Sequence, residues 1–233
     1  MLKSIAELVL EHPRLLVLSD EIYEYIQYTD DDGTDAARDA ASPFPPSIAS
    51  LPGMAERTLT VNGFSKAYAM TGWRLGYVAG PLPLARAMNI VQSQSTSGPS
   101  SIAQHAALAA LAMGSRGGKV VQETVRAFQR RRDLVVEKLR AMPGVALPEV
   151  PMGAFYALPN VSGLVGKGRS AKGYGPIPDA EALADYLLQS AHVAVVPGDA
   201  FGVPESLRLS FALADDQLER ALDRMAEALA RVE

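Results

Sequence analysis

Three charged side chains in the first third of the sequence stand where strands are predicted to end or begin. Asp20 follows the apolar run Leu15–Leu18, and Lys66 lies just past the alternating stretch Thr58–Val61. Arg74 opens the next predicted strand. Because open α/β sheets bind ligands at the carboxyl ends of their strands, this spacing predicts a carboxylate, an amine and a guanidinium on one rim of a sheet. Such a set can bind anion oxygens and move protons.

Each of these residues also has an ordinary structural explanation, so the chemistry depends on the elements around them. An Asp at a strand end is commonly a turn former or a helix cap, and a single Lys after a Ser means little by itself. The spacing of Leu2, Ile5, Leu8 and Val9 predicts a short helix that stops at His12-Pro13. The apolar run that follows predicts a buried strand, and together they indicate a unit of a parallel sheet.

The composition excludes several other kinds of chemistry. The chain has 233 residues, no cysteine and a formal net charge of −4, which excludes disulfides, thiolate nucleophiles and cysteine-based metal centres. The scattered basic residues give no nucleic-acid footprint, and no apolar stretch approaches the roughly 20 residues of a membrane span. The histidines are isolated from one another. We therefore expect no nucleic-acid partner, no membrane and no metal.

The rest of the chain adds helices and then a second set of short strands. Helical patterns cover residues 85–94, 102–113 and 120–142, followed by strands near 154–158, 193–196 and 207–211 and helices at 180–191 and from 215. The pattern predicts an α/β protein with a large-domain portion over residues 1–115, containing an incomplete, mostly parallel sheet, and an α+β small domain over residues 116–233 that includes the long connecting helix. A doubly wound sheet usually has about five or more strands, so part of this sheet is expected to be missing.

Two longer motifs give the rim residues a specific context. The first is Asp20-Glu-Ile-Tyr23, and the second runs from Asn62-Gly-Phe-Ser-Lys66 to Met70-Thr-Gly-Trp-Arg74-Leu-Gly-Tyr77. Together they resemble the pyridoxal-phosphate-dependent aminotransferases of fold type I, and the resemblance extends over essentially the whole chain. It implies the three-layer large domain of that fold, present here in part, followed by its small domain.

The resemblance implies a role for each matched position. Lys66 would form a Schiff base with pyridoxal 5'-phosphate (PLP) and move the proton at the substrate α-carbon. Asp20 would pair with the pyridine nitrogen, Tyr23 would hydrogen-bond the ring hydroxyl oxygen, and Arg74 would hold the phosphate. Many family members have a phosphate-binding Ser just ahead of the lysine, where this chain has Gly63.

A further motif lies near the C-terminus. The stretch Ser206–Ala212 places Arg208 inside an alternating strand, where an Arg is otherwise commonly a rim residue. In the family, an Arg in this strand grips the substrate α-carboxylate, so the resemblance makes Arg208 the substrate-binding residue. Gly153–Tyr156 and Val195–Gly202 also match the family as segments that close over the site. They are given no catalytic role.

The detailed resemblance is to bacterial-type aspartate aminotransferases and prephenate aminotransferases, in the stretches Thr58–Pro81, Gln92–Ser97 and Phe128–Val135. It implies a homodimeric transaminase that moves an amino group between an amino acid, aspartate or glutamate, and a 2-oxo acid in a ping-pong cycle. Prephenate is a second candidate acceptor. A PLP-dependent lyase on the same scaffold and a catalytically incompetent fragment stay open, since both would retain these residues.

Family members are longer at the N-terminus, so we expect this chain to be truncated there. The absent part would hold the Gly-containing phosphate loop, the aromatic residue that stacks on the cofactor and the residues that select the substrate side chain. The expected compartment is the cytoplasm, or a plastid if the source is a plant or alga. In the plastid case the targeting segment would be missing from this chain.

Overall fold

The computed structural model describes residues 1–28 and 46–233, and the chain divides into two compact units, residues 1–125 and 126–233. We expected the division between residues 115 and 116, ahead of the long helix, but it falls inside that helix. A Cβ added at Gly117 would lie 2.4 Å from Cγ2 of Val121 and 3.3 Å from the ring of Tyr68. The first turns of the helix therefore pack with the first unit.

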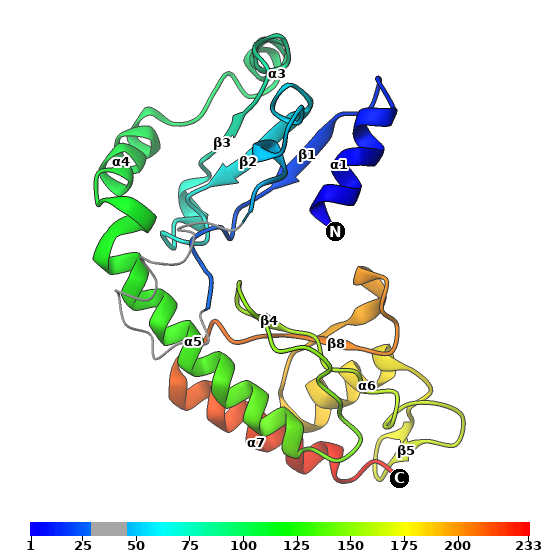
Figure 1. Ribbon diagram of the computed structural model, residues 1–233. Helices are drawn as coiled ribbons and strands as arrows, with labels where there is room; N and C mark the ends of the chain where they lie inside the picture. Colours follow the sequence, from blue (N-terminus) through cyan, green and yellow to red (C-terminus); the bar gives the residue numbers. More distant parts are fainter. Residues whose placement is uncertain (29–45) are drawn as a thin grey trace. The chain divides into compact units, whose positions relative to one another are not determined.

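The first unit is built around a three-stranded sheet (Figure 1). Its elements are α1 (Leu2–Glu11), β1 (Val17–Asp20), the 3-10 turns η1 (Ile48–Ser50) and η2 (Ala55–Arg57), β2 (Thr58–Gly63), the 3-10 turn η3 (Thr71–Trp73), β3 (Gly76–Ala79), α3 (Leu82–Ser95), α4 (Ser101–Leu111) and the 3-10 turn η4 (Ser115–Gly117). The strand order is β1-β2-β3. β1 is parallel to β2, whereas β3 is antiparallel to β2.

Two apolar clusters hold this sheet. On one side, Ala6 and Val9 of α1 pack with Ile48 and Met54, and Val17 of β1 lies against them. The second cluster joins three alanines of α4 (Ala103, Ala107 and Ala110) to Phe64 and Leu75, which flank the loop between β2 and β3. The first cluster holds α1 against β1, and the second holds both ends of the loop that carries Lys66 and Arg74.

The expectation that the first strand is buried was wrong for most of its residues. Leu15 and Leu16 are exposed, and the side chain of Leu18 in β1 is 69% exposed. The reason is that β1 is an outer strand of the sheet, and α1 covers only the face that carries Val17. All four residues of β3 are exposed as well.

Helix α3 is also largely uncovered among the described residues. It has no buried residue, and a groove of about 840 Å³ runs between it and β2 and β3. Tyr77, Val78, Met88 and Val91 are among the apolar side chains that line this groove. The sheet is therefore the partial α/β layer that the sequence predicted, but it is not mostly parallel, because only one of its two strand pairs is parallel.

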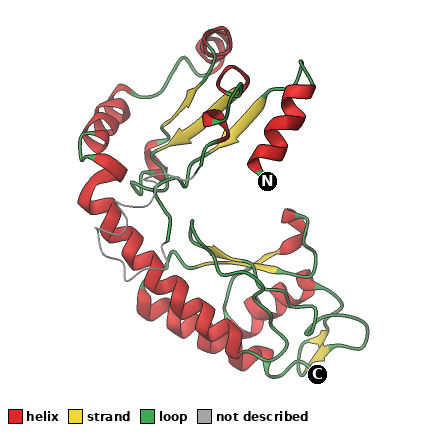
Figure 2. Ribbon diagram, viewed as in Figure 1, coloured by secondary structure: helices red, strands yellow, loops and turns green. Residues whose placement is uncertain are grey.

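Short strands and long loops make up most of the second unit (Figure 2). After α5 (Gly118–Ala141), which spans the division between the units, come β4 (Tyr156–Ala157), β5 (Ser170–Ala171), β6 (Gly175–Pro176), α6 (Ala180–Tyr186), a π-helical turn η5 (Leu187–Ala191), β7 (Val196–Pro197), the 3-10 turn η6 (Gly198–Phe201), β8 (Leu207–Ser210) and α7 (Asp215–Leu229). One antiparallel sheet has the order β4-β8-β7, and β5 pairs with β6. Leu183, Leu207, Phe211 and Met225 are fully buried in the core.

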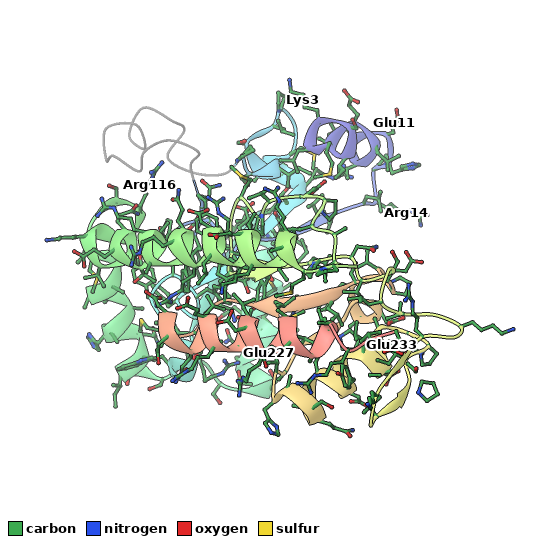
Figure 3. The ribbon with its side chains drawn as sticks, turned by 90° about the horizontal axis from the view of Figure 1, so that it is seen from below. Lys3, Glu11, Arg14, Arg116, Glu227 and Glu233 are labelled. Atoms are coloured by element: carbon green, nitrogen blue, oxygen red, sulfur yellow. The ribbon has the colours of Figure 1, made fainter. Side chains whose placement is uncertain are left out.

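Helices α5 and α7 lie side by side in the second unit (Figures 1 and 3). Arg131 of α5 pairs with Asp215 at the start of α7, and Lys138 pairs with Asp223 further along it. Because both partners' numbers rise together, the two helices run in the same direction. The hydrogen bond from Arg131 lowers the pKa of Asp215. No helix in residues 1–28 and 46–233 has both the length and the apolar character needed to cross a membrane.

Candidate active site

The ends of all three strands of the first unit meet at one edge of the sheet. Because β1 and β2 are parallel, their carboxyl ends lie together, with Asp20 opposite Val61. Because β3 is antiparallel, it begins at this same edge, with Gly76 opposite Gly63. The edge therefore brings together Asp20, the residues that follow Gly63 and those that precede Gly76, as the spacing predicted.

Asp20 is the last residue of β1, and its carboxylate is exposed. Its Oδ1 accepts a hydrogen bond of 3.3 Å from the backbone N–H of Ile22, so the residue also caps the turn that follows. Tyr23 lies half-buried in this turn, and its carbonyl accepts the backbone N–H of Ile26 at 2.8 Å. Asp20 is therefore both a turn former, as is common for an Asp at a strand end, and a residue of the rim.

Lys66 lies half-buried in a tight turn that leaves β2. Its carbonyl accepts the backbone N–H of Ala69 at 3.2 Å. The loop is closed by two further backbone bonds, from Phe64 N–H to the carbonyl of Leu75 at 3.4 Å and from Met70 N–H to the carbonyl of Phe64 at 3.2 Å. The buried ring of Phe64 anchors it to the α4 cluster, so the backbone that carries Lys66 is held at both ends.

Arg74 lies in the turn before β3 rather than in the strand itself. Its backbone is left-handed, with φ 52° and ψ 48°, a conformation that a strand does not allow, and β3 therefore begins only at Gly76. The exposed guanidinium donates from Nη1 to the carbonyl of Thr71 at 3.1 Å. Arg74 also lines a cavity of about 790 Å³, together with Trp73, Ser100 and other residues of the same unit.

A close approach of β2 and β3 explains the glycine that stands where many family members have a Ser. A Cβ added at Gly63 would lie 3.1 Å from the Cα of Gly76 and 3.1 Å from the carbonyl oxygen of Leu75. A Cβ added at Gly76 would lie 2.9 Å from the carbonyl oxygen of Asn62. The paired glycines let β2 and β3 approach closely at the two ends that flank the loop carrying Lys66 and Arg74.

A buried polar cluster behind the rim was missed by the sequence reasoning. Asn62 donates from its side-chain amide to Glu24 Oε1 at 2.7 Å, and its Oδ1 accepts the backbone N–H of Gly63 at 2.7 Å. Burial raises the pKa of Glu24, and burial together with the charge of Glu24 raises the pKa of Tyr77. The hydrogen bond ties the segment after Asp20 to the end of β2. The alternation of Thr58–Val61, continued by one residue, was the signal that could have placed Asn62 on one face of the sheet.

Arg208 lies in the second unit, in the middle strand of its sheet. It is half-buried on β8, opposite Val196 of β7, while its neighbours Leu207 and Leu209 are buried. The structure thus gathers Asp20, Tyr23, Lys66 and Arg74 on one rim of the first unit. It places Arg208 on a strand of its own unit, as the alternating pattern predicted.

Comparison with known proteins identifies the class of protein to which this fold and rim belong. The family described as Aminotransferase class I and II matches residues 1–225. The chain therefore belongs to this family, whose members use PLP. The predicted fold class is confirmed, because solved aminotransferases superpose on the chain. An aspartate aminotransferase from Rhizobium meliloti has a TM-score of 0.87 at 42% identity and covers 99% of the chain.

Curated relatives are similar across the whole chain. An aspartate aminotransferase of Pinus pinaster is 50% identical over 98% of the chain, which spans 44% of that relative. A bifunctional aspartate aminotransferase and glutamate/aspartate-prephenate aminotransferase of Petunia hybrida is 49% identical over 100% of the chain and 45% of the relative. An aspartate/prephenate aminotransferase of Cereibacter sphaeroides is 47% identical, with 96% and 52% covered. The chain thus spans about half the length of the relatives it matches.

Proposed function

We propose that this protein is a PLP-dependent transaminase that moves an amino group from aspartate or glutamate to a 2-oxo acid in a ping-pong cycle. One observation carries the proposal. Asp20, Lys66 and Arg74 meet at one sheet edge in a chain that belongs to the aminotransferase family.

The chemistry of the rim residues fits PLP. The carboxylate of Asp20 suits the pyridine nitrogen, the amine of Lys66 the aldehyde, and the forked guanidinium of Arg74 the phosphate. When bound, PLP supplies an electron-accepting ring that stabilises negative charge at the substrate α-carbon. Asp20 would keep a proton on the ring nitrogen, and Lys66 would take and return the proton at the α-carbon. The phenol of Tyr23 would donate a hydrogen bond to the ring oxygen.

The substrates share an α-carboxylate, and we propose that Arg208 binds it. Arg208 is half-buried and has no hydrogen bond or ion pair with an acidic side chain in the part of the chain that the structure describes. A half-buried guanidinium that has no acidic partner favours a planar carboxylate as its ligand. Prephenate is a second proposed acceptor, which the names of the relatives from Petunia hybrida and Cereibacter sphaeroides support.

We also propose that the protein is a homodimer in the cytoplasm. Large apolar side chains on α3 and α4, namely Ile90, Val91, Ile102 and Leu108, are exposed on the first unit. Exposed large apolar side chains of this kind favour association with another protein surface.

Borohydride reduction in the presence of PLP tests the proposed cofactor site directly. The 233-residue chain is incubated with PLP, reduced, digested and mapped by mass spectrometry, with Lys66→Ala and the surface variant Lys119→Ala as controls. We expect one label per chain, on Lys66, lost in Lys66→Ala and retained in Lys119→Ala. Label scattered over several lysines, or persisting at full yield in Lys66→Ala, would refute the assignment.

Product analysis then separates transamination from lyase chemistry on the same residues. Unreduced protein loaded with PLP is supplied with aspartate and either 2-oxoglutarate or prephenate. A transaminase yields a new amino acid in equal amount to the oxo acid formed from aspartate. Release of free ammonia with no new amino acid would show a lyase instead.

A further inference from the structure

The guanidinium of Arg208 contacts two aromatic rings in the second unit. Its guanidinium carbon lies 4.7 Å from the ring centroid of Tyr156 and 4.4 Å from that of Phe201, over the face of each ring. The rings come from different elements, β4 and the end of η6. Because Tyr156 is paired with Ser210 and Ser210 is two residues from Arg208, both side chains stand on the same face of the sheet.

One of the two rings, that of Tyr156, packs against other aromatic rings of the unit. The ring of Tyr156 packs on Phe155 with centroids 4.7 Å apart, and Phe155 packs on Phe128 of α5 at 5.3 Å. Phe128 is buried, whereas Phe201 is 44% exposed. The guanidinium therefore contacts one ring that is packed against the core and a second ring that is more exposed.

Arg208 differs from two other arginines of its unit because it has no acidic partner among the described residues. Arg131 and Arg220 are both neutralised by acidic partners, Asp215 and Asp216. Within residues 1–28 and 46–233, Arg208 has aromatic contacts but no acidic partner. The two rings attract its charge without using its N–H groups, since the attraction acts on the flat faces of the guanidinium.

These ring contacts use none of the N–H groups, so the N–H edge of the guanidinium stays available to a ligand. That edge presents parallel N–H groups whose spacing matches the two oxygens of a carboxylate. A long, rotamer-rich side chain that is already held in place loses little freedom when its ligand binds. The rings thus prepare the arginine for a planar anion that approaches in the plane of the guanidinium.

We infer that Tyr156 and Phe201 are positioning residues that hold Arg208 for the α-carboxylate of every amino-acid and 2-oxo-acid substrate. The inference rests on the proposed function of Arg208. Since all these substrates share the α-carboxylate, loss of one ring should weaken them alike, by about two- to tenfold in dissociation constant. The preference among substrate side chains should not change.

The test uses the Nε–Hε NMR signal of Arg208, identified by its loss in Arg208→Lys, and titration with 2-oxoglutarate. In the unsubstituted chain, ring currents from the two rings should move this signal upfield. Phe201→Leu, which keeps an apolar side chain but removes the ring, should return the signal downfield and weaken 2-oxoglutarate two- to tenfold. Phe201→Tyr should restore both, and Val203→Ala, in the same loop, should change neither.

Each contrary result has a distinct meaning. An Arg208 signal that is not upfield in the unsubstituted chain, or that Phe201→Leu leaves in place, overturns the positioning of Arg208 by the two rings. That conclusion holds whatever the protein's function. Equal 2-oxoglutarate affinity in the unsubstituted chain and Arg208→Lys overturns the proposed carboxylate site, and the inference with it. If Arg208→Lys weakens 2-oxoglutarate but Phe201→Leu does not, the proposed site stands and the positioning role is refuted.

Discussion

Replacing Gly76 by Ala tests whether the close approach of β2 and β3 supports the candidate site. The added Cβ would lie 2.9 Å from the carbonyl oxygen of Asn62, about 0.5 Å short of the ordinary contact range, which begins at 3.4 Å. Overpacking of this kind costs about 1–3 kcal/mol. Because β3 is an exposed outer strand that can shift, we expect the lower part of that range, about 1–2 kcal/mol.

Gly72→Ala is the matched control. No heavy atom lies within 4 Å of the Cβ that this substitution adds, and Gly72 is not in the left-handed region. Both variants gain about 0.4–1 kcal/mol from the reduced freedom of the unfolded chain, and this gain cancels when they are compared. The difference in unfolding free energy between the two variants therefore measures the steric cost alone.

The assay is urea unfolding followed by far-ultraviolet circular dichroism, with borohydride labelling of Lys66 as the functional readout. We expect Gly76→Ala to be less stable than Gly72→Ala by about 1–2 kcal/mol, a factor of roughly 5 to 30 in the folded-to-unfolded ratio. Labelling of Lys66 should fall only in Gly76→Ala, because the strand shift displaces the loop between the paired glycines. If Gly76→Ala is as stable as Gly72→Ala, the close strand approach is not a constraint and the reasoning is refuted.

Two further predictions concern buried polar groups. Burial raises the pKa of Glu24 above 4.5, so the folded chain holds this proton more tightly than the unfolded chain, and stability falls as pH rises from 4.5 through the folded pKa. Glu24→Gln, which can still accept the hydrogen bond from Asn62, should reduce the difference between urea midpoints at pH 5 and pH 8; an unchanged difference would contradict this. Tyr186→Phe removes a buried hydroxyl that donates to the carbonyl of Ala228 at 2.9 Å and should cost about 0.5–1.5 kcal/mol in urea unfolding. Tyr174→Phe, whose bond is 3.3 Å and less buried, should cost less, and equal losses would argue against this account.

The features that could be predicted from the sequence are those set by neighbouring residues. The alternation of Thr58–Val61 and the apolar run before Asp20 placed two strands, and the carboxyl-end rule then placed Asp20 and Lys66 on one rim. Arg74 was expected to open the third strand, but it lies in the turn before β3, which begins at Gly76. Its exclusion from that strand depends on a left-handed backbone, for which an Arg gives no sequence signal.

The features that could not be predicted arise from contacts between distant segments. The exposure of Leu18 depends on which strands flank β1, and the pairing of Glu24 with Asn62 depends on the register between two segments. The family resemblance implied that Arg208 binds the substrate α-carboxylate, and its strand alone indicated only a rim residue. The rings of Tyr156 and Phe201 reach it from two other elements that no short-range pattern connects to β8.

The two outer strands of the first unit have a consequence for how this polypeptide behaves at high concentration. In the described residues, β1 and β3 each have one sheet neighbour, β2, so each offers an open row of backbone donors and acceptors. The two open edges belong to different strands with different sequences, so they are not equivalent surfaces. Association through unlike edges does not close on itself and can grow into open chains of molecules. Work at low protein concentration, or a charged residue placed on the β3 edge, would limit that growth and keep the rim accessible to ligands.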